Sequence, residues 1–238
     1  MKYSLLIIAI LCGCINLSAQ DGSTTDGFTY KGQTPSMEVF KQDGRPFTNP
    51  ASDIEGTPFF TDEWKFSGVT LNTGKVVANI KTRLNLQSQE LHFMDKNNVE
   101  MAVPGGLVKN VRFLESPGSD KVVAEFQSGF PPVDKQDEHS FYQVLSSGKA
   151  GLLLFRQKTL VTQKNDLSGE VKKEFTAYES LYLSRNGGLG KIKKDKEDVL
   201  NALADKKEII EAFVNSHRLK YRSMDDIRKI MDYYNSIP

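Results

Sequence analysis

The sequence predicts an α+β protein: an antiparallel curved β-sheet, forming a partial barrel or sandwich of about eight to ten strands, followed by two or three short C-terminal helices. Three observations lead to this fold class. Apolar and polar residues alternate along much of residues 56–185, and the connections between the alternating stretches are rich in Gly, Pro, Asn and Asp. Over residues 190–238 the apolar spacing becomes helical.

The chain opens with a segment that has the features of a secretory leader. Lys2 is followed by the apolar run LLIIAILCGCI, which suits the hydrophobic region of a signal peptide and is too short to span a bilayer as a helix. Cleavage after Ala19 would make residues 1–19 the signal peptide and Gln20 the first mature residue. The tetrapeptide LCGC also resembles a bacterial lipobox, in which Cys14 would carry the lipid. Both mature forms remain open.

A polar lead-in is expected over residues 20–55. It is rich in Gly, Thr, Ser, Pro and Asp and has no sustained apolar period, which is typical of a linker or of a segment draped over a domain. The short stretches FTYKG and MEVF within it would each suit an edge strand. If Cys14 were lipidated, this lead-in would act as the tether.

Residues 56–185 form the predicted β-rich domain. In VVANIKTRLNL, alternate residues from Val76 to Leu86 are mostly apolar and those between them polar, as in a half-buried antiparallel strand. The preceding FSGVTL and the turn signal LNTGK predict a hairpin over residues 66–86, and ELHFM and VEMAV flank the turn DKNN of a second hairpin. Further strands are expected at residues 107–114, 121–127, 141–145, 152–162 and 170–183.

The C-terminal region, residues 190–238, is predicted to hold amphipathic helices. Asp205 with Glu208, and Ser223 with Asp226, have the spacing of capping boxes. The apolar stripes need a surface to cover, so the helices are expected to pack on the sheet as part of one domain; a separate helical hairpin that binds a partner is the alternative. The stripes comprise Val199, Leu200, Leu203, Ile209, Ile210, Phe213, Val214, Ile227, Ile230, Met231 and Tyr234.

Charge and cysteine content narrow the classes of function. The chain has 31 Lys and Arg against 30 Asp and Glu, and removal of Lys2 with the leader leaves these charges balanced. A nucleic-acid-binding protein usually carries a strong basic excess, so no nucleic-acid partner is expected. Both Cys residues lie within residues 1–19, so a domain that starts at Gln20 has no disulfide, no thiolate metal site and no Cys nucleophile.

No motif of a known catalytic or cofactor site occurs in the sequence. G-x-S-x-G, H-E-x-x-H, the P-loop pattern and an EF-hand loop are all absent. His92, His139 and His217 are far apart, and His92 lies between Leu91 and Phe93, so alternation directs it away from the apolar face. We therefore expect no metal and no cofactor.

Three carboxylates are the candidate catalytic residues. Asp62 and Glu63 stand among aromatic residues in PFFTDEWKF, where an apolar setting would raise the pKa of an acid, although acids on a turn beside an aromatic core explain the pattern too. Glu179, in EFTAYESLYL, shares a strand face with apolar residues and is predicted to point inward. A buried carboxylate needs a partner, and Arg156 or Lys158 on the preceding strand would form a structural ion pair with it.

Three segments carry a resemblance to a known family: DEWKFSGVTLNTGKVVANIKTRLNLQSQELHFMD, SGFPPVDKQDEHSFYQVLSSGKAGLLLF and DKKEIIEAFVNSHRLKYRSMDDIRKIMDYYNS. Together they resemble a family of uncharacterised exported proteins of Bacteroidota, over roughly residues 56–237. The stretch NLSAQ looks like the end of their signal peptides. The resemblance implies export and a single domain, and it assigns no catalytic residue.

These observations favour an exported cell-envelope protein that binds a partner protein, a glycan or a lipid without catalysis. We expect it in the periplasm or secreted, or anchored through a lipid on Cys14 in the outer membrane, with no transmembrane span in the mature chain. The alternative is a carboxylate-dependent hydrolase that acts on envelope or environmental polymers and uses acids such as Asp62, Glu63 or Glu179.

Overall fold

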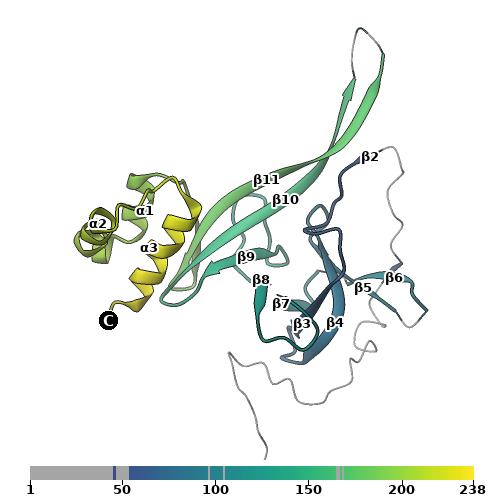
Figure 1. The fold of residues 1–238 in the computed structure, drawn as a ribbon, viewed down its shortest axis with the longest axis horizontal. Helices are drawn as coiled ribbons and strands as arrows, with labels where there is room; N and C mark the ends of the chain where they lie inside the picture. The colour runs from purple at the N-terminus through teal and green to yellow at the C-terminus, as the bar shows by residue number, and fades with distance from the viewer. Residues whose placement is uncertain (1–44, 47–53, 96, 104, 165–166, 168) are drawn as a thin grey trace, which may run out of the picture.

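The protein folds as one large open sheet followed by three short helices, which is the predicted fold class (Figure 1). A computed structural model describes residues 45–46, 54–95, 97–103, 105–164, 167 and 169–238. The stretches FTYKG and MEVF lie outside the described residues. The strands are β1 (Arg45–Pro46), β2 (Ile54–Glu55), β3 (Lys65–Leu71), β4 (Val76–Asn85), β5 (Glu90–Met94), β6 (Glu100–Val103), β7 (Val108–Leu114), β8 (Val122–Gln127), β9 (Tyr142–Ser146), β10 (Ala150–Lys164), β11 (Val171–Arg185) and β12 (Gly188–Ile192).

Eleven of the twelve strands among the described residues follow the order β1-β6-β5-β4-β3-β7-β8-β9-β10-β11-β12, and β2 pairs with β11 off this path. All neighbours are antiparallel except β2 and β11, which run parallel. Strands β3 to β11 lie where alternation predicts them. The two-residue strands β1 and β2 and the short β12 were not predicted, because pieces this short carry no readable period.

The first part of the sheet curls around a core of its own. Buried side chains from each of β3 to β8 contribute to one cluster, so these strands wrap the cluster as a partial barrel. The loop before β3 also packs there: Phe60 makes an edge-to-face contact with Phe126, with ring centroids 4.9 Å apart. Val69, Leu84, Phe93, Val111 and Phe113 are among its most buried members.

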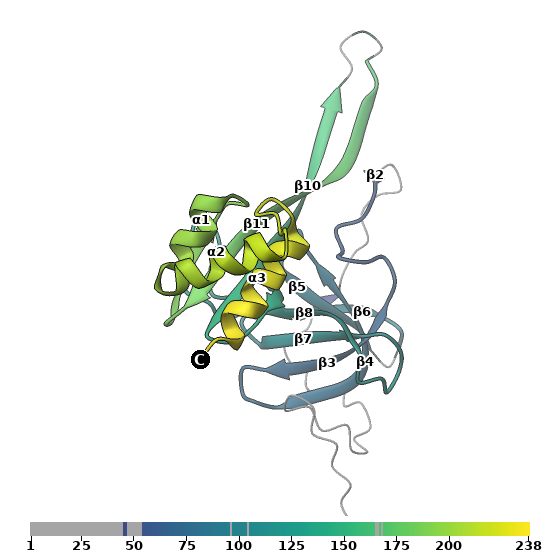
Figure 2. The ribbon, with the colours of Figure 1, turned by 60° about the vertical axis from the view of Figure 1, so that its left-hand side comes forward.

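The second part of the sheet, β9 to β12, is covered on both faces. Leu152 and Leu154 of β10 belong to a cluster with the helices, whereas Leu153 and Phe155 belong to a separate cluster with Tyr142 and the 128–140 loop. Since neighbouring residues of a strand point to opposite faces, the helices and the loop lie on opposite sides of the sheet. The helices therefore pack on the sheet, as expected, and Figure 2 shows them gathered beside β10 and β11.

The helices are α1 (Lys196–Ala202), α2 (Lys207–Ser216) and α3 (Met224–Ser236), with a 3₁₀ turn over Ala204–Lys206. Ser223 caps α3, its hydroxyl accepting a hydrogen bond from the Asp226 N–H, which is one half of the predicted capping box. The other half differs, because the Asp226 carboxylate accepts from the Lys220 N–H and the Ser223 N–H donates to the Lys220 carbonyl. The capping box predicted at Asp205 is wrong. Asp205 lies in the 3₁₀ turn, where its carboxylate accepts hydrogen bonds from Arg185 and Tyr234 instead.

The outer half of the β10–β11 hairpin extends beyond the rest of the sheet as an arm (Figures 1 and 2). Strand β9 pairs with β10 only from Leu152 to Phe155, although β10 and β11 remain paired to Lys164 and Val171. We call the hairpin beyond Arg156 and Glu179 the β-arm. None of the helices in the described part of the chain has the length and apolar character needed to cross a bilayer.

Candidate functional site

The acids of the PFFTDEWKF segment lie in the loop before β3 and are exposed. The Glu63 carboxylate accepts a hydrogen bond from Lys65 at 2.6 Å, and this hydrogen bond and the Lys65 charge lower the pKa of Glu63. A general acid needs the opposite shift, because it must hold its proton near neutral pH. Burial lowers the pKa of Lys158, and the negative charge of Asp62 opposes this shift.

The prediction that Glu179 points inward is wrong, since its side chain is 44% exposed. Glu179 does share a strand face with Leu181, but the core under that face ends at Leu181, where the hairpin begins to leave the sheet. The predicted partner is confirmed: Arg156 Nη1 lies 2.6 Å from Glu179 Oε1. Arg156 also donates to Gln143 at 2.8 Å, so the acid is held in a structural ion pair.

The three histidines occupy separate places. His139 lies in the loop before β9 against Gly105 and Gly106, and His217 follows the last residue of α2. His92, in β5, points away from the apolar face as predicted, yet it is fully buried, because the loop before β3 covers that second face and places the Phe59 ring 5.1 Å from its own. Within the described residues, no group of three or more His, Cys, Asp and Glu is arranged to hold a metal ion.

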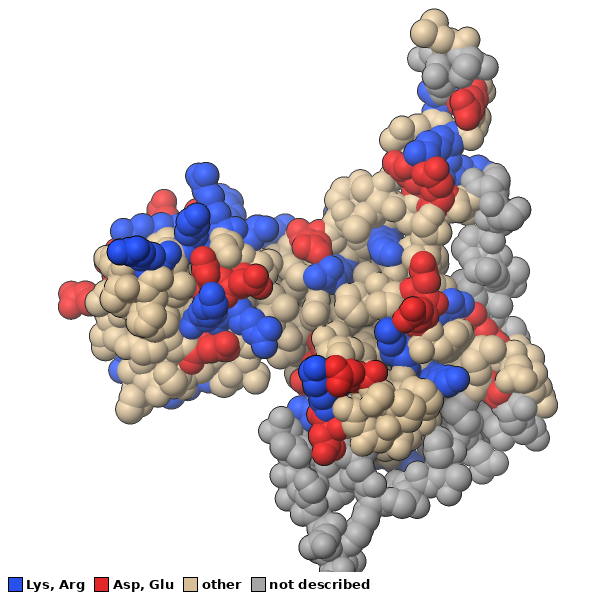
Figure 3. Space-filling model, in the orientation of Figure 1, with Lys and Arg blue, Asp and Glu red and all other residues tan. Residues whose placement is uncertain are grey.

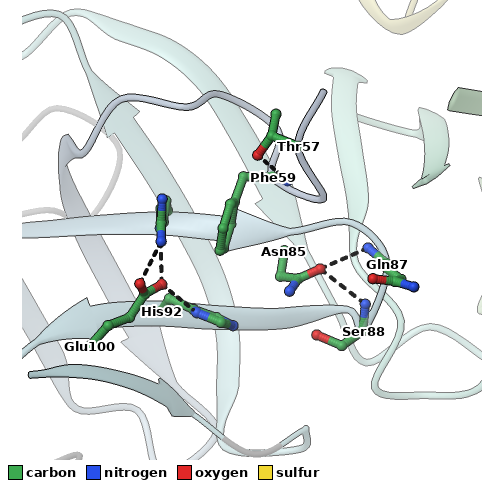
Figure 4. A network of polar contacts seen from close by, with 8 residues as sticks. Thr57, Phe59, Asn85, Gln87, Ser88, His92 and Glu100 are labelled. Carbon is green, nitrogen blue, oxygen red and sulfur yellow. Dashed lines mark hydrogen bonds and ion pairs between the residues drawn. The ribbon is translucent and has the colours of Figure 1, made fainter. Parts of the chain in front are cut away.

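His92 belongs to a buried polar network (Figure 4). Glu100 accepts a hydrogen bond from His92 Nδ1 at 2.7 Å and forms a two-pronged ion pair with Arg83, whose guanidinium stacks 3.6 Å above the Phe59 ring. Burial lowers the pKa of His92 even though Glu100 opposes the shift, so the imidazole is neutral and donates through Nδ1. Nearby, Asn85 accepts backbone hydrogen bonds that close the β4–β5 turn. The network links β4, β5 and β6 through buried and partly buried side chains.

A groove of about 680 Å³ lies among the described residues. It lies on the face of β9 to β11 opposite the helices, with Leu153 of β10 in its floor. Three connections form its walls: residues 129–132 after β8, the β9–β10 turn at residues 146–149, and the β11–β12 turn at residues 185–188. Its volume falls within the range of about 300–1,000 Å³ that is usual for small-molecule sites.

The groove lining combines apolar and polar groups. Phe130, Pro131 and Pro132 supply an apolar wall, and serines, glycines and Asn186 supply hydroxyl, backbone and amide groups. Glu138 carries the only negative charge of the lining, whereas Lys149 and Arg185 carry positive charges. Figure 3 likewise shows acidic and basic side chains interspersed on the face of the molecule that it draws, without a stripe of one sign.

One wall of the groove is fixed by helix α3. Asn235 accepts a hydrogen bond from the Ala150 N–H (3.0 Å) and donates to the Ala150 carbonyl (2.9 Å), as a neighbouring strand would. It also donates to the Ser147 carbonyl at 3.2 Å, and Ser146 Oγ donates to Asp232 at 2.6 Å. Gly148 is required here, since its φ is +146° and a Cβ would lie 2.6 Å from Asn235 Cγ. The turn is therefore held rigidly before any ligand arrives.

The opposite wall and the floor are anchored in the same way. Arg185 donates to Asp205 at 2.9 Å, and although burial acts to raise the pKa of Asp205, the hydrogen bonds from Arg185 and Tyr234 lower it, so the carboxylate stays ionised. Under the 128–140 loop, Tyr182 donates to Asp134 at 2.8 Å. Burial, with the charges of Asp134 and Asp137, raises the pKa of Tyr142 to about 12, so this phenol stays neutral.

Sequence reasoning did not find this groove. Its walls come from GFPPVDKQDE, SSGKAG and SRNGG, which read in the sequence only as turn and loop signals. Clusters of Gly, Ser and Pro do mark the places where backbone is exposed to a ligand, but nothing in a single sequence says that three of them meet.

Comparison of the chain with models of protein families, with curated proteins and with solved structures finds no match.

Proposed function

We propose that this protein is an exported, non-catalytic binding module of the cell envelope, and that its ligand binds in the groove between β9, β10, β11 and the 128–140 loop. The observation that carries the proposal is that side chains of the C-terminal region hold the groove walls in place: Asn235 of α3 binds Ala150, and Asp205 of the 3₁₀ turn binds Arg185. A preformed site of this volume loses little entropy when a ligand binds, which favours affinity.

Among a glycan, a partner protein and a lipid, the lining best fits a glycan. An apolar wall at Phe130 and Pro131 offers a surface on which the C–H face of a sugar ring can pack, and the opposite turns offer hydroxyl, amide and backbone groups to sugar hydroxyls. The mixed charges of Glu138 and Lys149 favour a ligand without a large net charge. A lipid tail would exclude water from the polar groups of the groove lining without offering them hydrogen bonds, which costs free energy.

The carboxylate-dependent hydrolase is supported less well. Glu63 is exposed with a lowered pKa, and Glu179 is held by Arg156. A hydrolase of this kind needs one acid with a raised pKa near a second, ionised acid. If Glu63→Gln or Glu179→Gln abolished turnover of a polysaccharide by the wild-type protein, the hydrolase would replace the binding module as the better reading.

A ligand screen with a groove variant tests the proposal. The purified chain would be applied to an array of neutral and acidic glycans, and the same array would be repeated with Phe130→Ala. Because aromatic contacts contribute about 0.5–1.5 kcal/mol beyond area burial, the variant should bind at least about twofold more weakly. Val123→Ala, an exposed apolar position on β8 outside the groove, is the control and should bind like the wild type.

Three outcomes of the screen are informative. A glycan that needs Phe130 supports both the binding site and its ligand class. If no glycan binds, and the same pair of proteins incubated with an envelope extract retains a protein or lipid only when Phe130 is present, the binding module is kept and the ligand class is replaced. A ligand that binds Phe130→Ala as tightly as the wild type would refute the groove as the binding site.

Export is part of the proposal and has its own test. Mass spectrometry of the protein from its own cells should give either a chain that starts at Gln20, as for a periplasmic or secreted protein, or a chain that starts at Cys14 with acyl groups, as for a lipoprotein of the outer membrane. A mass that retains residues 1–19 would contradict both forms.

A further inference from the structure

The β-arm has one edge that is covered and one that is bare. On the β11 side, β2 adds a short parallel strand at Lys173 and Glu174. On the β10 side, β9 ends its pairing at Phe155, and two further contacts follow: Gln89 donates to the Arg156 carbonyl at 3.1 Å, and the Lys158 N–H donates to the Leu86 carbonyl at 3.2 Å.

The direction of the Lys158 N–H fixes which backbone groups face outward beyond it. In an antiparallel pair, successive residues direct their N–H and C=O groups alternately to the two edges of the strand. Lys158 directs its N–H away from β11, so Leu160, Thr162 and Lys164 do the same. The described part of the chain offers these three residues no hydrogen-bond partner on that edge. An uncovered edge of this kind is a template for another strand.

The composition of the β-arm also favours a partner strand. The bare edge reads TLVTQK, with β-branched residues, no proline and no acidic residue. The arm also carries three of the exposed large apolar side chains of the described residues, namely Leu167, Val171 (53% exposed) and Tyr178 (54%). Lys164 is the only charge on the edge from Thr159 onward.

We propose that this edge pairs with the same edge of a second copy of the chain, antiparallel and about a two-fold axis at Thr162. In that register Thr162 lies opposite the second copy's Thr162, and Leu160 lies opposite its Lys164, so all three outward-facing residues exchange their backbone hydrogen bonds and none is left over. No like charges lie directly opposite each other, and a Thr–Thr pair is favourable across strands. The edge is self-complementary, which is the reason to assign it to a second copy rather than to a foreign strand.

A single cysteine tests the register. The chain from Gln20 has no cysteine, so Thr162→Cys introduces a unique thiol. In the proposed dimer the two Cα atoms at this position would be about 5.5 Å apart and the Cβ atoms about as far, which exceeds the Cβ separation of about 3.5–4.5 Å in a relaxed disulfide but is within reach of a short thiol-specific cross-linker. A short bismaleimide should therefore convert Thr162→Cys largely to a covalent dimer. Gln157→Cys is the control on the same strand; its thiols would lie far from the axis, and it should stay monomeric.

Light scattering supplies an independent readout. The wild-type chain should show a concentration-dependent doubling of mass. Thr162→Pro removes an outward N–H without removing a β10–β11 hydrogen bond, so it should remain monomeric, whereas Thr162→Ser should dimerise like the wild type. A monomeric wild type at every concentration, or equal cross-linking of Thr162→Cys and Gln157→Cys, would overturn the proposal. A circular dichroism spectrum and melting curve like those of Thr162→Ser would show that the proline variant is folded.

Discussion

Asn235 should be worth far more to stability than an ordinary polar residue near the end of a helix. Its side chain satisfies the N–H and the C=O of Ala150, a residue that is 1% exposed. Removing it in Asn235→Ala leaves both backbone groups without this partner, and each buried unsatisfied group costs about 1–3 kcal/mol. Alanine returns about 0.5 kcal/mol through its higher helix propensity. Two such groups cost about 2–6 kcal/mol, so we expect a net loss of about 1.5–5.5 kcal/mol.

Asn235→Asp sharpens this test because it conserves shape. The aspartate keeps an acceptor for the Ala150 N–H, but it sets an oxygen against the carbonyls of Ala150 and Ser147, where Asn235 donates at 2.9 Å and 3.2 Å. Its loss of stability should equal or exceed that of the alanine variant. Urea unfolding followed by circular dichroism gives these differences, with Asn201→Ala, an exposed position on α1, as a control expected to change stability by less than about 0.5 kcal/mol.

The result that would refute the reasoning is a free energy of unfolding for Asn235→Ala within about 0.5 kcal/mol of the wild type. It would mean that water replaces the side chain at no cost, and that α3 does not fix the groove wall. An aspartate variant as stable as the wild type would contradict the assignment of the amide as a donor to the two carbonyls.

Three further predictions concern residues of the sheet. The pKa of His92 is lower in the folded protein than in the unfolded chain, so below about pH 6.5 the unfolded state binds more protons and the stability of the folded state is lost as the pH falls. Between about pH 7 and pH 5, the urea midpoint of His92→Gln should therefore fall less steeply than that of the wild type. Equal slopes would contradict the lowered pKa of His92. Tyr142→Phe removes a buried hydroxyl that has no hydrogen-bond partner among the described residues, so thermal unfolding should show unchanged or slightly higher stability. A loss of more than about 1 kcal/mol would show that the hydroxyl does have a partner. Gly151→Ala should be destabilising because its Cβ would lie 2.5 Å from Ser184 Oγ, and much of that loss should be recovered with Ser184→Ala; a double-mutant cycle without coupling would disprove the steric cause.

The strands and helices were predictable because their signals are local. The alternation from Val76 to Leu86 is a property of neighbouring residues, and it predicts β4 and the β3–β4 hairpin without knowledge of the rest of the chain. The same holds for Ser223, whose hydroxyl caps a helix three residues from its bonded N–H. The ion pair of Glu179 with Arg156 was also within reach, since two successive strands of a hairpin bring such residues opposite each other.

The sequence by itself therefore determined the class of fold, the order of most elements and the faces of the strands, because backbone sterics and side-chain periodicity act over a few residues. Only the tertiary structure decided whether a face is covered. Alternation directs Glu179 and Leu181 to the same face, but the core ends between them, and it directs His92 away from the core, yet Phe59 closes over it. The groove and the bare edge of the β-arm have the same origin, since both depend on which distant segments meet and where the sheet runs out of neighbours.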